Sequence, residues 1–170
     1  MTQIQACWTA PSPGWVKANW DAPLESQKGL VGCAVVVRDH LGKMMVAKCT
    51  TRKGYPTPLV AEALVAIMAV RLCREMDLQR VHFEGDAKTI VEAMNSGAEN
   101  RSSIGMVMED LRQVLQTLVT WKISCIKREG NNSAHVLAKF ATKNDLEKVW
   151  VHPPDCIREQ LLLELFALAA

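Results

Sequence analysis

The stretch RVHFEGD, residues 80–86, is the best guide to the fold of this chain. Its first six residues have the composition of a buried strand, and residues 87–96 follow with the spacing of a short helix. A long apolar helix is predicted just before it, over residues 58–76. Helix, strand and helix therefore follow one another, and this alternation predicts an α/β protein with helices packed on a sheet.

Three more strands are predicted before the first helix, over residues 16–21, 30–38 and 43–49. Residues 39–42 have the composition of a hairpin turn, in which Gly42 can adopt positive φ, and residues 50–57 are predicted to form a loop. Further along we expect a loop over 95–105, a helix over 104–118 and a strand over 120–127. A helix ending near Lys143 and a last helix from Asp155 complete the chain. An antiparallel opening followed by crossover units predicts a mixed sheet.

The bulk composition is that of one globular domain. The chain has 170 residues, of which 49% are hydrophobic and 22% charged, so it can bury a sizeable core. We expect an extended lead-in over residues 1–14, the domain itself over residues 15–143, and a linker with a C-terminal helix over residues 144–170.

Net charge and cysteine usage limit the possible partners, metal sites and cellular compartment. The net charge of +2 is too small to indicate a nucleic-acid partner by itself. Six cysteines stand singly without a CxxC pair, which argues against zinc and for a reducing compartment. Neither a secretory signal nor a membrane-spanning run is recognisable. We expect an intracellular protein, nuclear or cytosolic, that is a monomer and does not enter a membrane.

Three carboxylates stand where predicted elements begin or end. Asp21 closes the first strand, Glu62 lies near the start of the long helix, and Asp86 joins a strand to a helix. Glu62 is the one acid on a helix face of apolar and small residues, where a buried carboxylate needs a cation or a strong donor. Acids at three such junctions can converge at one edge of a sheet and bind Mg²⁺.

Each of these acids also has an ordinary explanation. Glu62 is favoured in a first helical turn by the helix dipole, and Asp86 is a good N-cap for the helix after it. Asp21 could be a solvated strand end. The prediction of a metal site therefore depends on the three acids taken together.

Several motifs in order make the chain similar to a known group. It resembles the plant ribonuclease H-like domain found at the end of plant non-LTR reverse transcriptases and in related stand-alone proteins. The matching segments are GWVKANWD at 14–21, GCAVVVRD at 32–39 with Gly42, AEA at 61–63, EGD at 84–86 and KREGNNSAHVLA at 127–138. The likeness covers about residues 14–142. It implies a ribonuclease H-like fold, a five-stranded mixed sheet in the order 3-2-1-4-5 flanked by helices.

The resemblance also implies an activity and a site. It implies a metal-dependent endonuclease that hydrolyses the RNA strand of RNA–DNA hybrids by a two-metal mechanism with Mg²⁺, or alternatively Mn²⁺. Asp21, Glu62 and Asp86 would be the catalytic acids and metal ligands. His135 stands where these enzymes carry a fourth acid, so it is a further catalytic candidate. Its other interpretation is a solvated surface histidine.

Some residues depart from the enzymes' pattern and keep other functions open. Ala22-Pro23 follows the first acid, Leu59-Val60-Ala61 lacks polar side chains that read 2′-hydroxyls, and the segment 96–104 is too short for an extra basic helix. Pro23 also argues against a proofreading-type exonuclease, which would have an acid there.

Besides the endonuclease, two other functional classes remain open. The alternative function is a retrotransposon-derived, non-catalytic nucleic-acid-binding domain that contacts phosphates through the basic pairs 52–53 and 127–128, namely Arg52, Lys53, Lys127 and Arg128. A third class is a protein-interaction module that uses the C-terminal helix. An apolar stripe of this helix could dock on the sheet or on a partner, and it consists of Ile157, Leu161, Leu162, Leu165 and Leu168.

Overall fold

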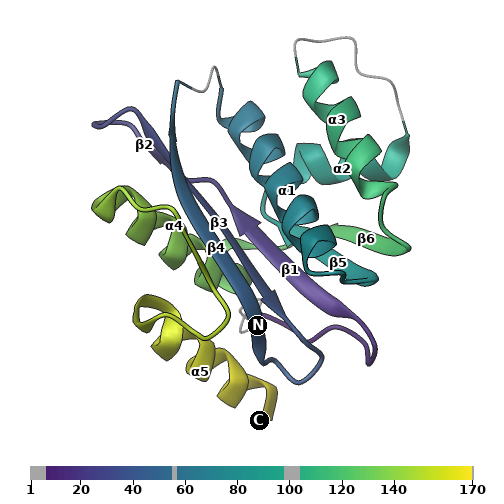
Figure 1. Ribbon diagram of the computed structural model, residues 1–170, viewed down its shortest axis with the longest axis vertical. Helices are drawn as coiled ribbons and strands as arrows, with labels where there is room; N and C mark the ends of the chain where they lie inside the picture. Colours follow the sequence, from purple (N-terminus) through teal and green to yellow (C-terminus); the bar gives the residue numbers. More distant parts are fainter. Residues whose placement is uncertain (1–6, 55–56, 98–103, 170) are drawn as a thin grey trace, which may run out of the picture.

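A mixed sheet with helices on both faces forms the body of the protein (Figure 1). The computed structural model describes residues 7–54, 57–97 and 104–169. The strands are β1 (Val16–Asp21), β2 (Leu24–Glu25), β3 (Leu30–Arg38), β4 (Met44–Lys53), β5 (Arg80–Gly85), β6 (Thr120–Cys125) and β7 (Lys148–Trp150). The helices are α1 (Pro58–Glu75), α2 (Lys88–Ser96), α3 (Gly105–Leu115), α4 (Asn132–Asn144) and α5 (Asp155–Ala169), and a 3₁₀ turn, η1, spans Arg128–Gly130.

The strand order is β6-β5-β1-β3-β4-β7, with β2 paired to the start of β3. The five predicted strands correspond to β1, β3, β4, β5 and β6, so their order along the sheet is the expected 3-2-1-4-5. Strands β1, β3 and β4 pair antiparallel, whereas β1, β5 and β6 pair parallel. The predicted fold is therefore confirmed, with two short strands added.

The two faces of the sheet carry separate apolar cores. Helices α1, α2 and α3 cover one face, and α4 and α5 cover the other (Figure 1). Successive residues of a strand point to opposite faces, so Val35 packs toward α1 while Val36 packs toward α4. Every residue of β3 is buried, as expected for a central strand covered on both sides.

The predicted loop over residues 50–57 is wrong at its start. Strand β4 continues to Lys53, and its residues from Thr50 to Lys53 pair with Leu30 to Cys33 of β3. Two successive threonines favour the extended conformation, and the long partner strand β3 offers hydrogen bonds as far as its first residue. Other predicted ends differ by three residues or fewer: α3 ends at Leu115 and β6 at Cys125.

The hairpin over residues 39–42 is confirmed, because Gly42 has φ of +82° and Asp39 and Lys43 pair through their backbones. The lead-in is more integrated than predicted: Trp8 is 1% exposed and donates to Asn19. Residues 1–6 of the lead-in and 98–103 of the loop after α2 lie outside the described residues. None of the described helices is long and apolar enough to cross a membrane.

The C-terminal helix docks on the fold. Ile157 and Leu161 of α5 are buried in the core on the α4 face. Leu162 and Leu168 of the predicted stripe are instead exposed, by 49% and 39%. The inner face of α5 therefore shares Ile157 and Leu161 with the predicted stripe, and it also includes the buried Glu164.

Candidate metal centre

Strand pairing places two of the three acids side by side. In the parallel pair of β1 and β5, Asn19 is opposite Glu84. Asp21 and Asp86 each lie two residues further along, so they reach the same edge of the sheet at the same level. Asp21 is 1% exposed, which excludes the interpretation of a solvated strand end.

Helix α1 brings the third acid to this edge. It begins there because Thr57 caps it, accepting a hydrogen bond from the Val60 amide at 3.2 Å, and Pro58 starts the first turn. Glu62 lies one turn further on and accepts a hydrogen bond from Trp20 Nε1 at 3.2 Å. Burial, followed by the charges of Asp21 and Asp86, raises the pKa of Glu62 to about 8.

Asp86 does not cap the helix that follows it. The N-cap of α2 is Ala87, without a side-chain hydrogen bond. The Asp86 carboxylate instead accepts a hydrogen bond from Arg128 Nε at 3.3 Å. The ordinary explanation of Asp86 as a capping residue therefore does not apply.

The three acids form a set of oxygen donors that suits a divalent cation. One carboxylate oxygen from each of Asp21, Glu62 and Asp86 lies within 4.8 Å of the others. Three hard oxygen donors at this spacing fit Mg²⁺ or Mn²⁺, which prefer carboxylates and water. Burial and, after it, the neighbouring charges of Asp21 and Asp86 raise the pKa of Glu62, and a bound cation would stabilise its charged form.

His135 contacts the same cluster from α4. Its Nδ1 lies 2.6 Å from Asp21 Oδ2, and its Nε2 lies 3.1 Å from Arg128 Nη1. A guanidinium only donates hydrogen bonds, so Nε2 accepts and the ring proton belongs on Nδ1, which donates to Asp21. The interpretation of a solvated surface histidine is therefore wrong. In this geometry both ring nitrogens are engaged, and His135 orients Asp21.

Two residues of this centre were not predicted in the roles they have. Arg128 was expected only as a phosphate contact, yet it joins His135 to Asp86. Asn131 is fully buried and donates from its side-chain nitrogen to the Trp20 carbonyl at 2.9 Å, which fixes the strand end before Asp21. Asparagine after glycine is typical of a turn, so the sequence carries no signal for this contact.

The other three basic residues that were predicted to contact phosphates are Lys127, Arg52 and Lys53. Lys127 is exposed beside η1, and no ion pair or hydrogen bond of its side chain is found among the described residues. Arg52 and Lys53 are exposed at the end of β4, two strands away from β1.

Comparison with known proteins agrees with this geometry. The family model described as reverse transcriptase-like matches residues 19–141, which include all three acids and His135. The chain belongs to this family. A provisionally named ribonuclease H protein of Arabidopsis thaliana is 25% identical over 140 residues. That alignment covers 79% of the chain but only 22% of the Arabidopsis protein, and it supports the resemblance to plant ribonuclease H-like domains.

Solved structures show the same fold. Ribonuclease H1 of Halobacterium salinarum superposes with a TM-score of 0.70 at 19% identity, covering 76% of this chain and 98% of that one. The N-terminal ribonuclease H domain of Rv2228c from Mycobacterium tuberculosis gives 0.68 at 18% identity, covering 77% and 95%. The compost-derived LC11 ribonuclease H1, solved in complex with an RNA/DNA hybrid, gives 0.67 at 20%, covering 76% and 97%. This ribonuclease H-like domain therefore accounts for nearly the whole length of each of these three chains.

Proposed function

We propose that this ribonuclease H-like domain is a metal-dependent endonuclease that hydrolyses the RNA strand of RNA–DNA hybrids. The observation that carries the proposal is the convergence of Asp21, Glu62 and Asp86 within 4.8 Å at one edge of a ribonuclease H-like sheet. An RNA/DNA hybrid is bound in the LC11 structure, which shares this fold. The whole Arabidopsis relative is much longer than this chain, so its substrates and partners are not carried over.

Asp21, Glu62 and Asp86 would hold the cations. Divalent ions bound there would supply an activated water and stabilise the leaving oxygen, in the two-metal manner of many nucleases. Asp21 is the most buried of the three acids and would be a ligand of the cations. Its orientation is fixed by the hydrogen bond from His135.

His135, at the position of a fourth acid, distinguishes this centre from that of an enzyme with four acids. His135 stands in place of a fourth carboxylate, and its Nε2 would reach an ion if Arg128 moved away. Imidazole suits Mn²⁺ better than Mg²⁺. A second ion would therefore have fewer hard oxygen ligands than in an enzyme with four acids. We propose that the domain is active with Mg²⁺ and more active with Mn²⁺.

Cleavage of a hybrid labelled on its RNA strand tests the proposal. The wild-type protein should cut the RNA strand in Mg²⁺ and faster in Mn²⁺, and leave the same RNA uncut when it is single-stranded. Asp86→Asn should lower the rate by at least about a hundredfold, because it removes a charged ligand. Lys143→Gln, an exposed change on the far end of α4, is the matched control.

The alternative is a nucleic-acid-binding domain without turnover. The contact of Arg128 with Asp86 favours it, because a resident cation already offsets part of the negative charge. Hybrid that is bound but uncut in both metals would establish this alternative and overturn the hydrolase.

A further inference from the structure

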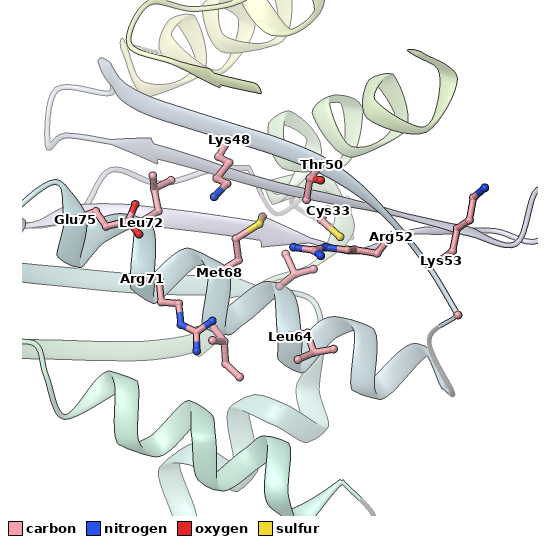
Figure 2. Close-up of a pocket in the computed structure, with 13 residues that line it drawn as sticks. Cys33, Lys48, Thr50, Arg52, Lys53, Leu64, Met68, Arg71, Leu72 and Glu75 are labelled. Carbon is pink, nitrogen blue, oxygen red and sulfur yellow. The ribbon is translucent and has the colours of Figure 1, made fainter. Parts of the chain in front are cut away.

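A groove of about 740 Å³ lies between α1 and β4, away from the metal centre (Figure 2). We call it the α1–β4 groove and define it by Lys48, Thr50 and Arg52 of β4 and Leu64, Met68 and Arg71 of α1. It exists because α1 packs over β1 and β3, while α2 and α3 lie on the other side of α1 (Figure 1). On this face of β4, Val46 and Thr50 are buried, whereas Lys48 is half-buried and Arg52 is exposed.

Alternation along β4 puts polar residues on the face that lines the groove. Lys48, Thr50 and Arg52 share this face, and their neighbours across β3 are Val35, Cys33 and Val31, which pack under α1. A strand buried on both faces would carry apolar residues at all these positions. The floor of the groove is apolar, with Leu64 and Met68 only partly buried.

The charge of the groove is strongly positive. Lys48, Arg52, Lys53 and Arg71 line it, and Glu75 is the one acid among its described lining residues. Figure 2 shows Lys48 and Arg52 extending from β4 toward α1, whereas Lys53 turns away. Among residues 7–54, 57–97 and 104–169, no side chain forms an ion pair or hydrogen bond with Lys48, Arg52 or Arg71. These cations are therefore available to an anionic ligand.

The groove opens at the same edge of the sheet as the metal centre. Asp21 pairs with Ala34, and Ala34 pairs with Cys49. Arg52 lies three residues beyond Cys49 and two strands from β1, which places its Cα roughly 14 Å from that of Asp21. A nucleic-acid strand that leaves the metal centre across β3 would reach the groove within a few nucleotides.

The shape and chemistry select the kind of ligand. A volume near 740 Å³ is that of a site for a drug-sized ligand, so it takes a short piece of one strand and not a duplex. None of the described residues that line it is aromatic, so the affinity that these residues offer comes from charge and not from base stacking. Binding would come from phosphates on Lys48, Arg52 and Arg71, and would tolerate any base sequence.

We propose that the α1–β4 groove binds the phosphodiester backbone of a single nucleic-acid strand that continues beyond the metal centre. The proposal rests on the proposed function in placing this strand next to the cut site. It adds a binding site to that function, formed by residues outside the cluster of acids.

Binding of a fluorescent single-stranded RNA, measured by anisotropy in EDTA across a range of salt concentrations, tests this site without requiring cleavage. The test variant is Lys48→Gln/Arg52→Gln. The matched control is Lys43→Gln/Arg80→Gln, which removes one lysine and one arginine from exposed positions at the opposite edge of the sheet. Circular dichroism of both variants confirms that they are folded.

The groove variant should bind RNA several-fold more weakly, and its slope of log affinity against log salt should fall by roughly 1.4, about 0.7 for each lost phosphate contact. The control should keep the wild-type affinity and slope. Equal losses of RNA affinity in the groove and control variants would overturn the proposal. They would show that positive charge anywhere on the surface attracts RNA equally. A groove variant that loses polyglutamate binding but keeps RNA binding would also overturn it and identify an acidic-peptide site. Cleavage of a short hybrid without overhangs, assayed separately, reports on the metal centre alone.

Discussion

At the scale of single residues, a chain of contacts joins the side chains of the candidate metal centre. Asp21 contacts His135, His135 contacts Arg128, and Arg128 contacts Asp86. Three carboxylates this close repel one another unless cations offset them. Arg128 offsets part of this charge, at a side-chain exposure of 48% that leaves it free to move when a cation binds.

Replacement of Arg128 should therefore tighten metal binding. In Arg128→Ala, Asp86 loses its competing cation, and we expect the dissociation constant for Mg²⁺ to fall by about three- to tenfold, equivalent to about 1 kcal/mol. The metal-free protein should melt at a lower temperature than wild type. Calorimetric titration measures the first and thermal melting the second.

Lys127→Ala is the control, because Lys127 is an adjacent exposed cation without a described contact to the centre. An Mg²⁺ affinity that is unchanged or weaker in Arg128→Ala would show that Arg128 does not compete with the metal.

The acids could be predicted from the sequence, whereas their supporting residues could not. Asp21, Glu62 and Asp86 stand at ends of elements that the periodicity identifies, so their approximate position follows from local pattern. Arg128 and Asn131 act through contacts that join residues far apart in the chain, such as Asn131 to Trp20. Local pattern contains no information on such contacts.

At the scale of elements, close approach between β3 and α4 holds the histidine in place. Gly32 lies directly under α4, and a Cβ built there would come within 2.3 Å of the Ala138 carbonyl oxygen. The neighbour is helix backbone, which cannot rotate away as a side chain could. Glycine at this position therefore sets the distance between the sheet and the helix that carries His135.

Gly32→Ala should push α4 outward. We expect the free energy of unfolding to fall by about 1–3 kcal/mol, the usual cost of overpacking, as measured by urea denaturation. The His135 ring signals in NMR spectra should shift as well, because the contact with Asp21 lengthens. Wild-type stability together with unshifted His135 signals would show that the sheet and α4 adapt to the added methyl group.

The elements also show where sequence patterns are insufficient. The strands β1 and β5 were predicted, but the parallel register that aligns Asp21 with Asp86 depends on pairing across the sheet. The short strands β2 and β7 were missed, since two or three residues carry no periodicity. Strand β4 was cut short because its polar end resembles a loop until its partner β3 is considered.

At the scale of the whole molecule, a buried polar group joins the two ends of the described chain to the sheet. Arg38 is 1% exposed, stacks on the Trp8 ring at 3.8 Å and forms an ion pair with Glu164 of α5. Ser133 of α4 donates to the same carboxylate at 2.9 Å. Burial lowers the pKa of Arg38, and the Glu164 charge opposes this shift.

Removing one partner of this pair should be costly. Glu164→Ala leaves the Arg38 charge buried without its carboxylate, and we expect a loss of about 3–5 kcal/mol in the free energy of unfolding. Glu159→Ala, an exposed acid on the same helix, should change it by less than about 0.5 kcal/mol. Chemical denaturation measures the free energy of unfolding of both variants. Similarly small losses in the two variants would show that α5 contributes little to the stability of the fold.

The central claim is that Asp21, Glu62 and Asp86 form one metal centre, and anomalous diffraction at the manganese edge tests it most directly. Crystals grown with Mn²⁺ should show an anomalous peak in contact with carboxylate oxygens of all three acids. Arg128 should be displaced from Asp86 in the same crystals. A peak elsewhere, or none at this edge of the sheet at saturating Mn²⁺, would contradict the account.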